Sequence, residues 1–114
     1  VASLQAVGLK NNTSAYLRTQ ANVLAGDIFD SMRANRPNAV NGDYEIEIGT
    51  AATSGTSVAE LDLRQWKTNL ANLLPAGDGA VDCVAEECTV TVQWRDAQQD
   101  GSLGTETISV VTRL

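Results

Sequence analysis

Apolar residues recur with helical spacing over the first third of the chain. Five of them follow one another at intervals of four, three, four and four residues: Leu17, Ala21, Leu24, Ile28 and Met32. Charged residues fall mostly off this face. Pro37 ends the pattern, because the residue before a proline avoids the α-helical region. The pattern predicts a helix over residues 1–36 that packs through its second half.

The predicted helix is long for a chain of 114 residues. A helix of 36 residues spans about 54 Å, whereas a compact domain of this size has a radius of gyration of about 13 Å. Residues 1–16 include Leu4 and Val7 but also a polar run at 11–14. We expect this part to project beyond the body and to dock against other helices in an assembly. The alternative is that it folds back or frays, since an isolated helix gains little stability in water.

The rest of the chain predicts a short strand, a second helix and a sheet. Residues 44–48 alternate apolar and charged side chains, as in a half-buried strand with Tyr44, Ile46 and Ile48 facing inward. Ser57 and Glu60 have the spacing of a capping box. One helix face follows them: Ala59, Leu63, Trp66, Leu70 and Leu73. Alternation then predicts strands over 88–94 and 105–114.

These elements predict an α+β fold with the single domain 1–114. The long helix is expected over 1–36, a strand, loop and short second helix over 37–80, and the antiparallel sheet, of about four strands in all, over 81–114. The apolar faces predict a core that includes seven residues: Ile28, Met32, Trp66, Leu70, Val90, Val92 and Trp94.

The chain has two cysteines, Cys83 and Cys88, and no histidine. Half of a zinc site is one interpretation, but carboxylates would have to complete it, which is unusual for structural zinc. A disulfide is the interpretation that we favour. It would close a six-residue ring, add about 2 kcal/mol of stability in the chain-entropy model, and indicate an oxidising compartment.

Charge argues against nucleic-acid binding. The formal net charge is −6, and the sequence pI is near 4.4, so no general basic surface is available to neutralise phosphates. Residues 1–36 carry four basic and two acidic side chains, whereas the remaining residues carry four basic and twelve acidic ones. The first segment therefore differs in charge from the body.

The sequence offers little for catalysis, since it lacks a histidine base and a phosphate-binding loop. The best metal candidate is a weak calcium loop over 96–106, in which Asp96, Gln98 and Asp100 match the opening of an EF-hand loop. The closing position holds Thr107 instead of glutamate, and strands flank the loop. We expect a hairpin loop there, no cofactor and no enzyme activity.

Three segments resemble one protein family. Residues 11–36 resemble the helix of type IV pilus minor pilins of the PilV kind, also called type IV pilus modification proteins. The match rests on Leu24-Ala25-Gly26-Asp27 followed by Met32-Arg33-Ala34-Asn35. Residues 66–81 are similar to the tryptophan-led helix of that family, and residues 89–96 are similar to one of its strands.

The resemblance implies a pilin-like fold without catalytic residues. Members of the family begin with a prepilin leader and an apolar helix half that anchors in the inner membrane. Neither segment is present here, so the resemblance implies a soluble, N-terminally truncated form. The body would lie in the periplasm before assembly and in the extracellular pilus afterwards, with no nucleic acid and no small-molecule substrate as partners.

Other minor pilins and the major pilin would be the partners, bound through the N-terminal helix. The sequence assigns this assembly face to five residues: Leu4, Val7, Leu17, Ala21 and Leu24. Two alternatives remain open. A pseudopilin of a type II secretion system shares the architecture, and a tip adhesin would need an exposed apolar or aromatic patch. Trp66 and Trp94 are the large candidates for such a patch, but both fall on faces predicted to point inward.

Overall fold

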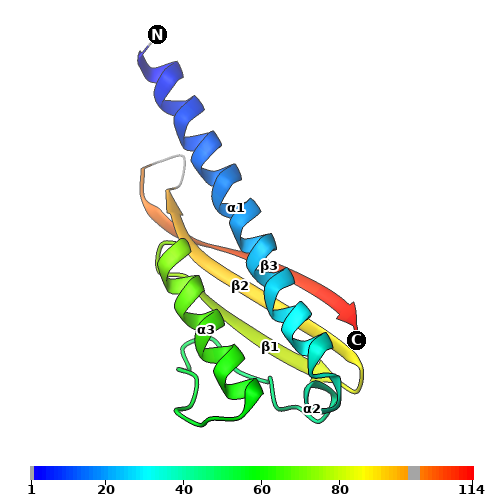
Figure 1. Cartoon of the computed structure of the whole chain (residues 1–114). Coiled ribbons are helices and arrows are strands. Elements are labelled where there is room, and N and C mark those ends of the chain that lie inside the picture. Colours follow the sequence, from blue (N-terminus) through cyan, green and yellow to red (C-terminus); the bar gives the residue numbers. More distant parts are fainter. Residues whose placement is uncertain (1, 98–100) are drawn as a thin grey trace.

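The computed structural model describes residues 2–97 and 101–114, with side chains described from Thr13 onward. It is an α+β fold with a long N-terminal helix and an antiparallel sheet (Figure 1). The elements are α1 (Ala2–Ala34), α2 (Arg36–Val40), α3 (Val58–Leu73), β1 (Asp78–Val84), β2 (Glu87–Ala97) and β3 (Leu103–Arg113). The expected α+β class is confirmed.

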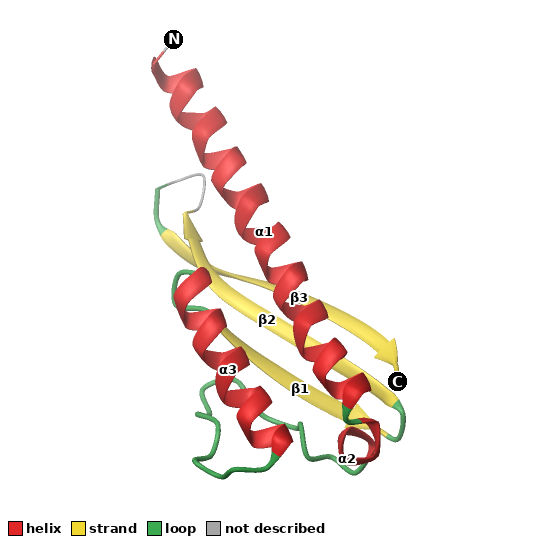
Figure 2. Ribbon diagram, in the orientation of Figure 1, coloured by secondary structure: helices red, strands yellow, loops and turns green. Residues whose placement is uncertain are grey.

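The sheet has three strands in the order β1-β2-β3, and both pairs are antiparallel. Val81, Val90 and Val110 lie beside one another across the sheet. Helices α1 and α3 lie side by side on one face of the sheet (Figure 2), with α1 against β2 and β3 and α3 against β1. The opposite face has no helix on it within the described residues.

The prediction of about four strands is wrong because residues 44–48 do not form a strand. Only Ile46 joins the sheet, through two backbone hydrogen bonds with Val81 of 3.1 and 2.9 Å. Gly49 then turns the chain away with a φ of 81°, and its N–H donates to the Asp78 carboxylate at 2.7 Å. Tyr44 is buried as expected, but Ile48 is exposed. Of the three residues predicted to face inward, Tyr44 is therefore buried and Ile46 forms a single bridge, and no strand forms.

The long helix ends slightly earlier than predicted. Asn35, with φ −128° and ψ 44°, interrupts the helical backbone after Ala34. Pro37 lies in the first turn of α2, where its missing N–H costs no hydrogen bond. The proline thus begins a second short helix in addition to limiting the first, and Arg36 belongs to α2.

Helix α3 begins as the capping-box spacing indicates. The Ser57 side chain accepts the Glu60 N–H at 3.2 Å, and its hydroxyl donates to the Glu60 carboxylate at 2.8 Å. The C-terminal end of α3 differs from the prediction. Leu73 is 47% exposed, and the buried residue is Leu74, because the backbone becomes extended at Leu74 (φ −127°, ψ 138°) and redirects its side chain.

The core lies between the two helices and the sheet. The seven residues that the sequence placed there are each no more than 3% exposed: Ile28, Met32, Trp66, Leu70, Val90, Val92 and Trp94. Phe29, next to the predicted helix stripe, is buried as well. Gly79 on β1 allows close packing in the core, since a Cβ there would lie 2.4 Å from the Trp66 ring and 2.8 Å from a Leu70 methyl group.

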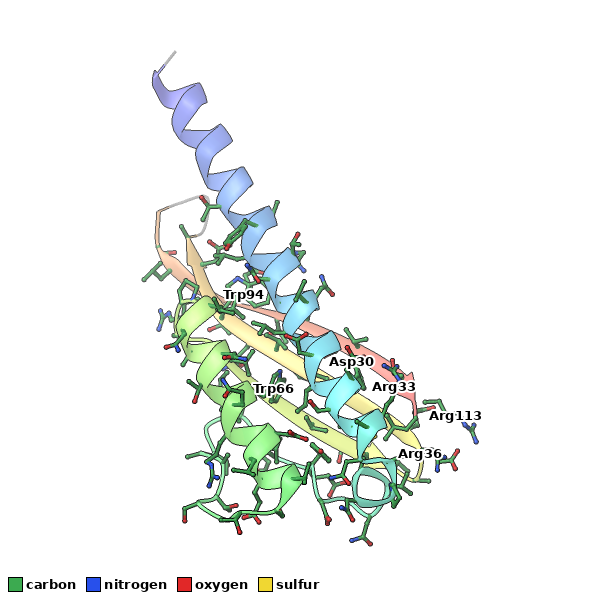
Figure 3. The ribbon with its side chains drawn as sticks, viewed as in Figure 1. Asp30, Arg33, Arg36, Trp66, Trp94 and Arg113 are labelled. Atoms are coloured by element: carbon green, nitrogen blue, oxygen red, sulfur yellow. A yellow bond between two sulfur atoms is a disulfide. The ribbon has the colours of Figure 1, made fainter. Side chains whose placement is uncertain are left out.

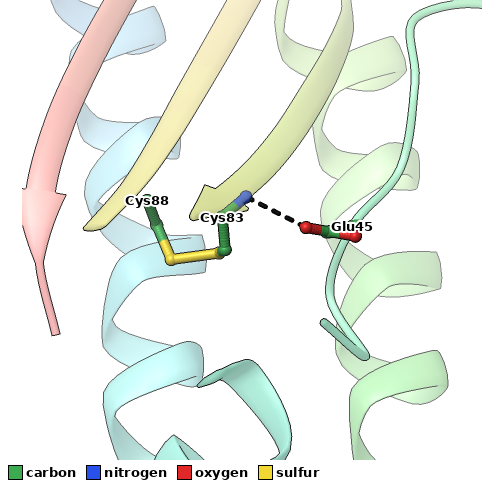
Figure 4. The surroundings of a disulfide bond; sticks show 3 residues. All are labelled: Glu45, Cys83 and Cys88. Atoms are coloured by element: carbon green, nitrogen blue, oxygen red, sulfur yellow. Dashed lines mark hydrogen bonds between the residues drawn. A yellow bond between two sulfur atoms is a disulfide. The ribbon is translucent and has the colours of Figure 1, made fainter. Parts of the chain in front are cut away.

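The predicted disulfide is present and closes the β1–β2 hairpin. Cys83 and Cys88 lie opposite each other in the sheet, with their Cα atoms 4.1 Å apart. The two-residue loop beyond them begins with Ala85 at a φ of 55°, a left-handed conformation that costs a non-glycine residue about 1–2 kcal/mol. The Cys83 N–H donates to the Glu45 carboxylate at 3.2 Å (Figure 4), so the covalent link and the preceding loop both hold this end of the sheet.

Candidate functional site

The first half of α1 is the feature most suited to contact another molecule. The molecule measures 56 × 27 × 18 Å, and its radius of gyration of 15.8 Å exceeds the value of about 13 Å expected for a compact chain of this length. Figure 1 shows the cause: α1 extends well past the end of the sheet toward the N-terminus. Among the described side chains, burial begins at Leu17.

The assembly face assigned from the sequence needs correction. Leu17, Ala21 and Leu24 are 7%, 0% and 2% exposed, so their side chains belong to the core and cannot contact another subunit. They continue the same stripe as Ile28, and the sheet extends far enough to cover them. The side chains of Leu4 and Val7 lie outside the described residues.

Three contacts hold this part of α1 on the body, two made by the Arg18 side chain and one by the Leu24 carbonyl. The Arg18 guanidinium pairs with Glu106 of β3 at 3.4 Å and lies 5.8 Å from the centre of the Trp94 ring. Six residues further along α1, the Trp66 indole N–H of α3 donates to the Leu24 carbonyl at 2.9 Å in a buried position. Figure 3 shows both tryptophans between the helices and the sheet, so neither forms an exposed aromatic patch.

The outer surface of α1 carries exposed residues that the sequence analysis missed. Tyr16 and Val23 are 58% and 53% exposed. Their spacing of seven residues, two helical turns, was the available signal that they share a face. Gly26 is also exposed, and a Cβ there would meet nothing within 4 Å. Glycine costs about 1 kcal/mol relative to alanine inside a helix, and no contact within the described residues requires it.

The other end of α1 is held by ion pairs. Glu86, in the β1–β2 loop, accepts from Arg36 at 2.7 Å and from Arg113 at 3.3 Å. These guanidinium groups, that of Arg36 above all, hold the pKa of Glu86 below its usual range. Arg33 pairs with Asp30 at 3.3 Å. The three arginines at this end (Figure 3) are therefore engaged with carboxylates and do not form an open anion site.

The best-buried ion pair joins α3 to β1. Lys67 Nζ lies 2.6 Å from Asp78, and the two side chains are 13% and 25% exposed. The same carboxylate accepts N–H bonds from Gly49 and Gly79, while Lys67 also donates to the Glu47 carbonyl. Burial alone would raise the pKa of Asp78, but the Lys67 ammonium and the two N–H groups outweigh burial and lower it.

Asp78→Ala is expected to lower the free energy of unfolding by about 2–3 kcal/mol at neutral pH, because Lys67 would lose its partner in a mostly buried position. Since the pKa of Asp78 is lowered in the folded state, its contribution is fully present above its ordinary value of 3.8 and is lost as the pH falls through the lower folded value. Urea unfolding at several pH values should show that the difference in unfolding free energy between Asp78→Ala and the parent chain shrinks only below pH 3.8.

The matched control is Asp82→Ala, which removes an exposed carboxylate from the same strand. It should change stability by less than about 0.5 kcal/mol. Equal effects of the two substitutions, or a difference that persists at the acid end of the series, would show that the Lys67–Asp78 pair does not stabilise the fold.

A polar cleft of about 190 Å³ lies between α1 and α3, with Asp27, Ser31, Asp62 and Asn69 in its walls. Asp62 also contacts Tyr44, whose hydroxyl donates to Asp62 in a short contact and accepts from Asn35 at 3.3 Å. Burial, and then the bond to Asp62, raise the pKa of Tyr44 to about 12. The tyrosine hydroxyl therefore stays protonated at neutral pH and links the 44–48 segment to α3 and to Asn35, which directly follows α1.

The calcium-loop candidate is not assembled in the described part of the chain. Asp96 lies within β2 opposite Gly104, is 9% exposed, and accepts the N–H of Ala97 at 2.8 Å. Gln98 and Asp100 lie outside the described residues. Across residues 2–97 and 101–114, no three acidic, cysteine or histidine side chains gather in a way that could hold a metal ion.

Comparisons with known proteins give no relative. No family model, no curated protein and no solved structure matches this chain. Within the described residues, none of the helices is both long enough and apolar enough to cross a bilayer. Proposals about function therefore rest on the chain's own residues and geometry.

Proposed function

We propose that this chain is a minor pilin, a structural subunit that helps to start assembly of a type IV pilus and lies at or near its tip with other minor pilins. The observation that carries the proposal is the division of α1. Its second half is part of the core of an α+β body, whereas its first half extends past that body. Such a helix is suited to joining a bundle of similar helices, because packing supplies most of the stability of a helix in a protein.

Charge and covalent structure support the same role. The helical segment 1–36 has more basic than acidic side chains, and the rest of the chain is strongly acidic. The disulfide in the β1–β2 hairpin is typical of proteins that fold in an oxidising compartment such as the periplasm. We propose an inner-membrane location before assembly, with the body in the periplasm, and the extracellular pilus afterwards.

The contacts with other subunits are assigned to surfaces that the chain's own core leaves free. Leu4 and Val7, in the extending half of α1, remain the proposed residues of the assembly face. Tyr16 and Val23 join them, because both are exposed on α1. Gly26 would let another backbone come close to the helix, since no side chain stands there.

The test is a pull-down of the full-length gene product from the envelope of piliated cells. We expect other pilin-like subunits to co-purify, and Leu4→Lys combined with Val7→Lys to reduce their recovery severalfold, because a buried unpaired charge is costly in a helix interface. Leu61→Lys is the matched control, since it places the same charge at an exposed leucine of α3 and should leave recovery unchanged.

The identity of the partners decides between the alternatives. Recovery of secretion-system pseudopilins in place of pilins would replace the pilus role by a type II secretion role. Recovery of no pilin-like subunit, together with retention of a glycan or host ligand by the body, would contradict an assembly role and support an adhesin.

A further inference from the structure

The sheet has two edges, and the hydrogen-bond pattern shows which backbone groups each edge presents. The N–H and the carbonyl of Val81 both bond to Ile46 and so point away from β2. Residues directly opposite in an antiparallel pair alternate between bonded and non-bonded pairs. The N–H and carbonyl of Val90 therefore point toward β3, and those of its partner Val110 point toward β2. The bond from the Leu114 N–H to the Glu86 carbonyl agrees with this assignment, because both residues are even-numbered, like Val90 and Val110.

The odd-numbered residues of β3 consequently direct their N–H and carbonyl groups away from the sheet. The alternation runs without a bulge along the whole β2–β3 pair, from Glu87 opposite Arg113 to Ala97 opposite Leu103. Four of these residues occupy the middle of the strand: Thr105, Thr107, Ser109 and Val111. No described strand pairs with this side of β3.

The opposite edge is closed by the chain itself. Ile46 bonds to Val81, the Glu45 carboxylate accepts the Cys83 N–H at 3.2 Å, and the Asp78 carboxylate accepts the Gly79 N–H at 2.8 Å. Natural proteins usually protect an edge strand with proline, bulges, lysine or a covering segment. Over residues 103–112, β3 has no proline, no lysine and no bulge.

We propose that the free edge of β3 pairs with the β3 edge of a second copy of this chain, in antiparallel orientation, to form a continuous six-stranded sheet. A strand that presents its own edge is complementary to itself about a two-fold axis. Placing that axis at Ile108 pairs the full length of β3 and sets the bonding groups of Thr107 opposite those of Ser109 in the second copy.

This register suits the side chains as well as the backbone. On the helix-facing side, Ile108 lies opposite Ile108 of the second copy, and Val110 lies opposite the aliphatic part of Glu106 of the second copy. Each Glu106 carboxylate remains paired with Arg18 of its own chain. On the other side, Val111 lies opposite Thr105, and Arg113 lies opposite Leu103. No like charges face each other, and β-branched residues on both sides favour strand pairing.

The inference goes beyond the proposed function and does not depend on it. The two-fold pairing uses β3 and no residue of the extending half of α1, which is the part assigned to contacts with pilin-like subunits. Self-association of the body is therefore a separate property, and it can fail while the pull-down of pilin-like subunits succeeds.

Sedimentation equilibrium over a range of protein concentrations tests the proposal, together with amide hydrogen exchange followed by NMR. We expect a monomer–dimer equilibrium. Exchange at Thr105, Ser109 and Val111 should slow as the dimer forms, whereas Glu106, Ile108 and Val110 should be protected at all concentrations because they bond to β2. Thr107→Pro removes an N–H that the subunit does not use, and should weaken dimerisation by about tenfold or more.

Val111→Lys is a second edge variant that keeps every backbone donor, in case Thr107→Pro does not fold. Thr89→Lys is its matched control, since Thr89 is the cross-strand neighbour of Val111 and lies on the central strand, which already pairs with a strand on each side. A monomer at every concentration overturns the proposal. So does a dimer that both edge variants leave intact, or protection of the odd-numbered amides in the monomer.

Discussion

Trp66→Ala should lower the free energy of unfolding by about 4 kcal/mol, within the range for large-to-small substitutions of buried aromatic residues. Trp66 is 3% exposed and is the residue through which three elements meet. It projects from α3, donates its indole N–H to the Leu24 carbonyl of α1 at 2.9 Å, and packs directly on Gly79 of β1. Its removal would leave a cavity that the sheet cannot close, because the backbone at Gly79 has no side chain to fill it.

The matched control for Trp66→Ala is Leu73→Ala, in the same helix. The apolar pattern assigns Leu73 to the same face, but the structure leaves it 47% exposed, so its truncation should cost less than about 1 kcal/mol. Urea unfolding followed by far-ultraviolet circular dichroism measures both, since tryptophan fluorescence itself changes with the variant. Equal losses at the two positions would contradict the observed end of α3.

Leu24→Ala should destabilise the body by about 3 kcal/mol, within the range of buried leucine truncations. Leu24 is 2% exposed, and its neighbours in the core include Ala21, Ile28 and Trp66. The carbonyl of the same residue accepts the Trp66 indole bond, so side chain and backbone of Leu24 both fasten α1 to the body. The same substitution would cost little if Leu24 belonged to a subunit interface, as its sequence pattern alone allowed.

Val23→Ala separates these two interpretations. Val23 is adjacent in sequence but 53% exposed, so we expect a loss of less than about 0.5 kcal/mol. Chemical unfolding of the isolated chain gives both values. A stable Leu24→Ala variant that loses pilin-like partners in the pull-down would restore Leu24 to the assembly face and contradict its role in the core.

The division of α1 into a packed half and an extending half has a consequence for variants throughout the helix. From Leu17 onward, substitutions on the inward stripe change the stability of the body before they can change any interaction. Substitutions at Tyr16 or Val23 change a surface that the body does not need. Function and stability can therefore be varied separately along one helix, which is what a test of the assembly proposal requires.

Local patterns in the sequence determined several features of this protein by themselves. Helical spacing fixed the inward stripe that contains Ile28 and Met32, because the geometry of a helix sets which residues share a side. The Ser57–Glu60 spacing fixed the start of α3. Two cysteines five positions apart made a disulfide the favoured interpretation, and the structure has it. In each case, the interacting groups are close along the chain.

The tertiary structure decided what covers each face. The spacing that placed Leu17, Ala21 and Leu24 on one side of α1 could not tell whether a sheet or another subunit lies there, because both bury the same apolar surface. In the same way, the alternation in 44–48 could not show that only Ile46 would reach β1. Periodicity indicates which side chains share a face, whereas whether that face is buried, and by which partner, depends on contacts between residues far apart in sequence.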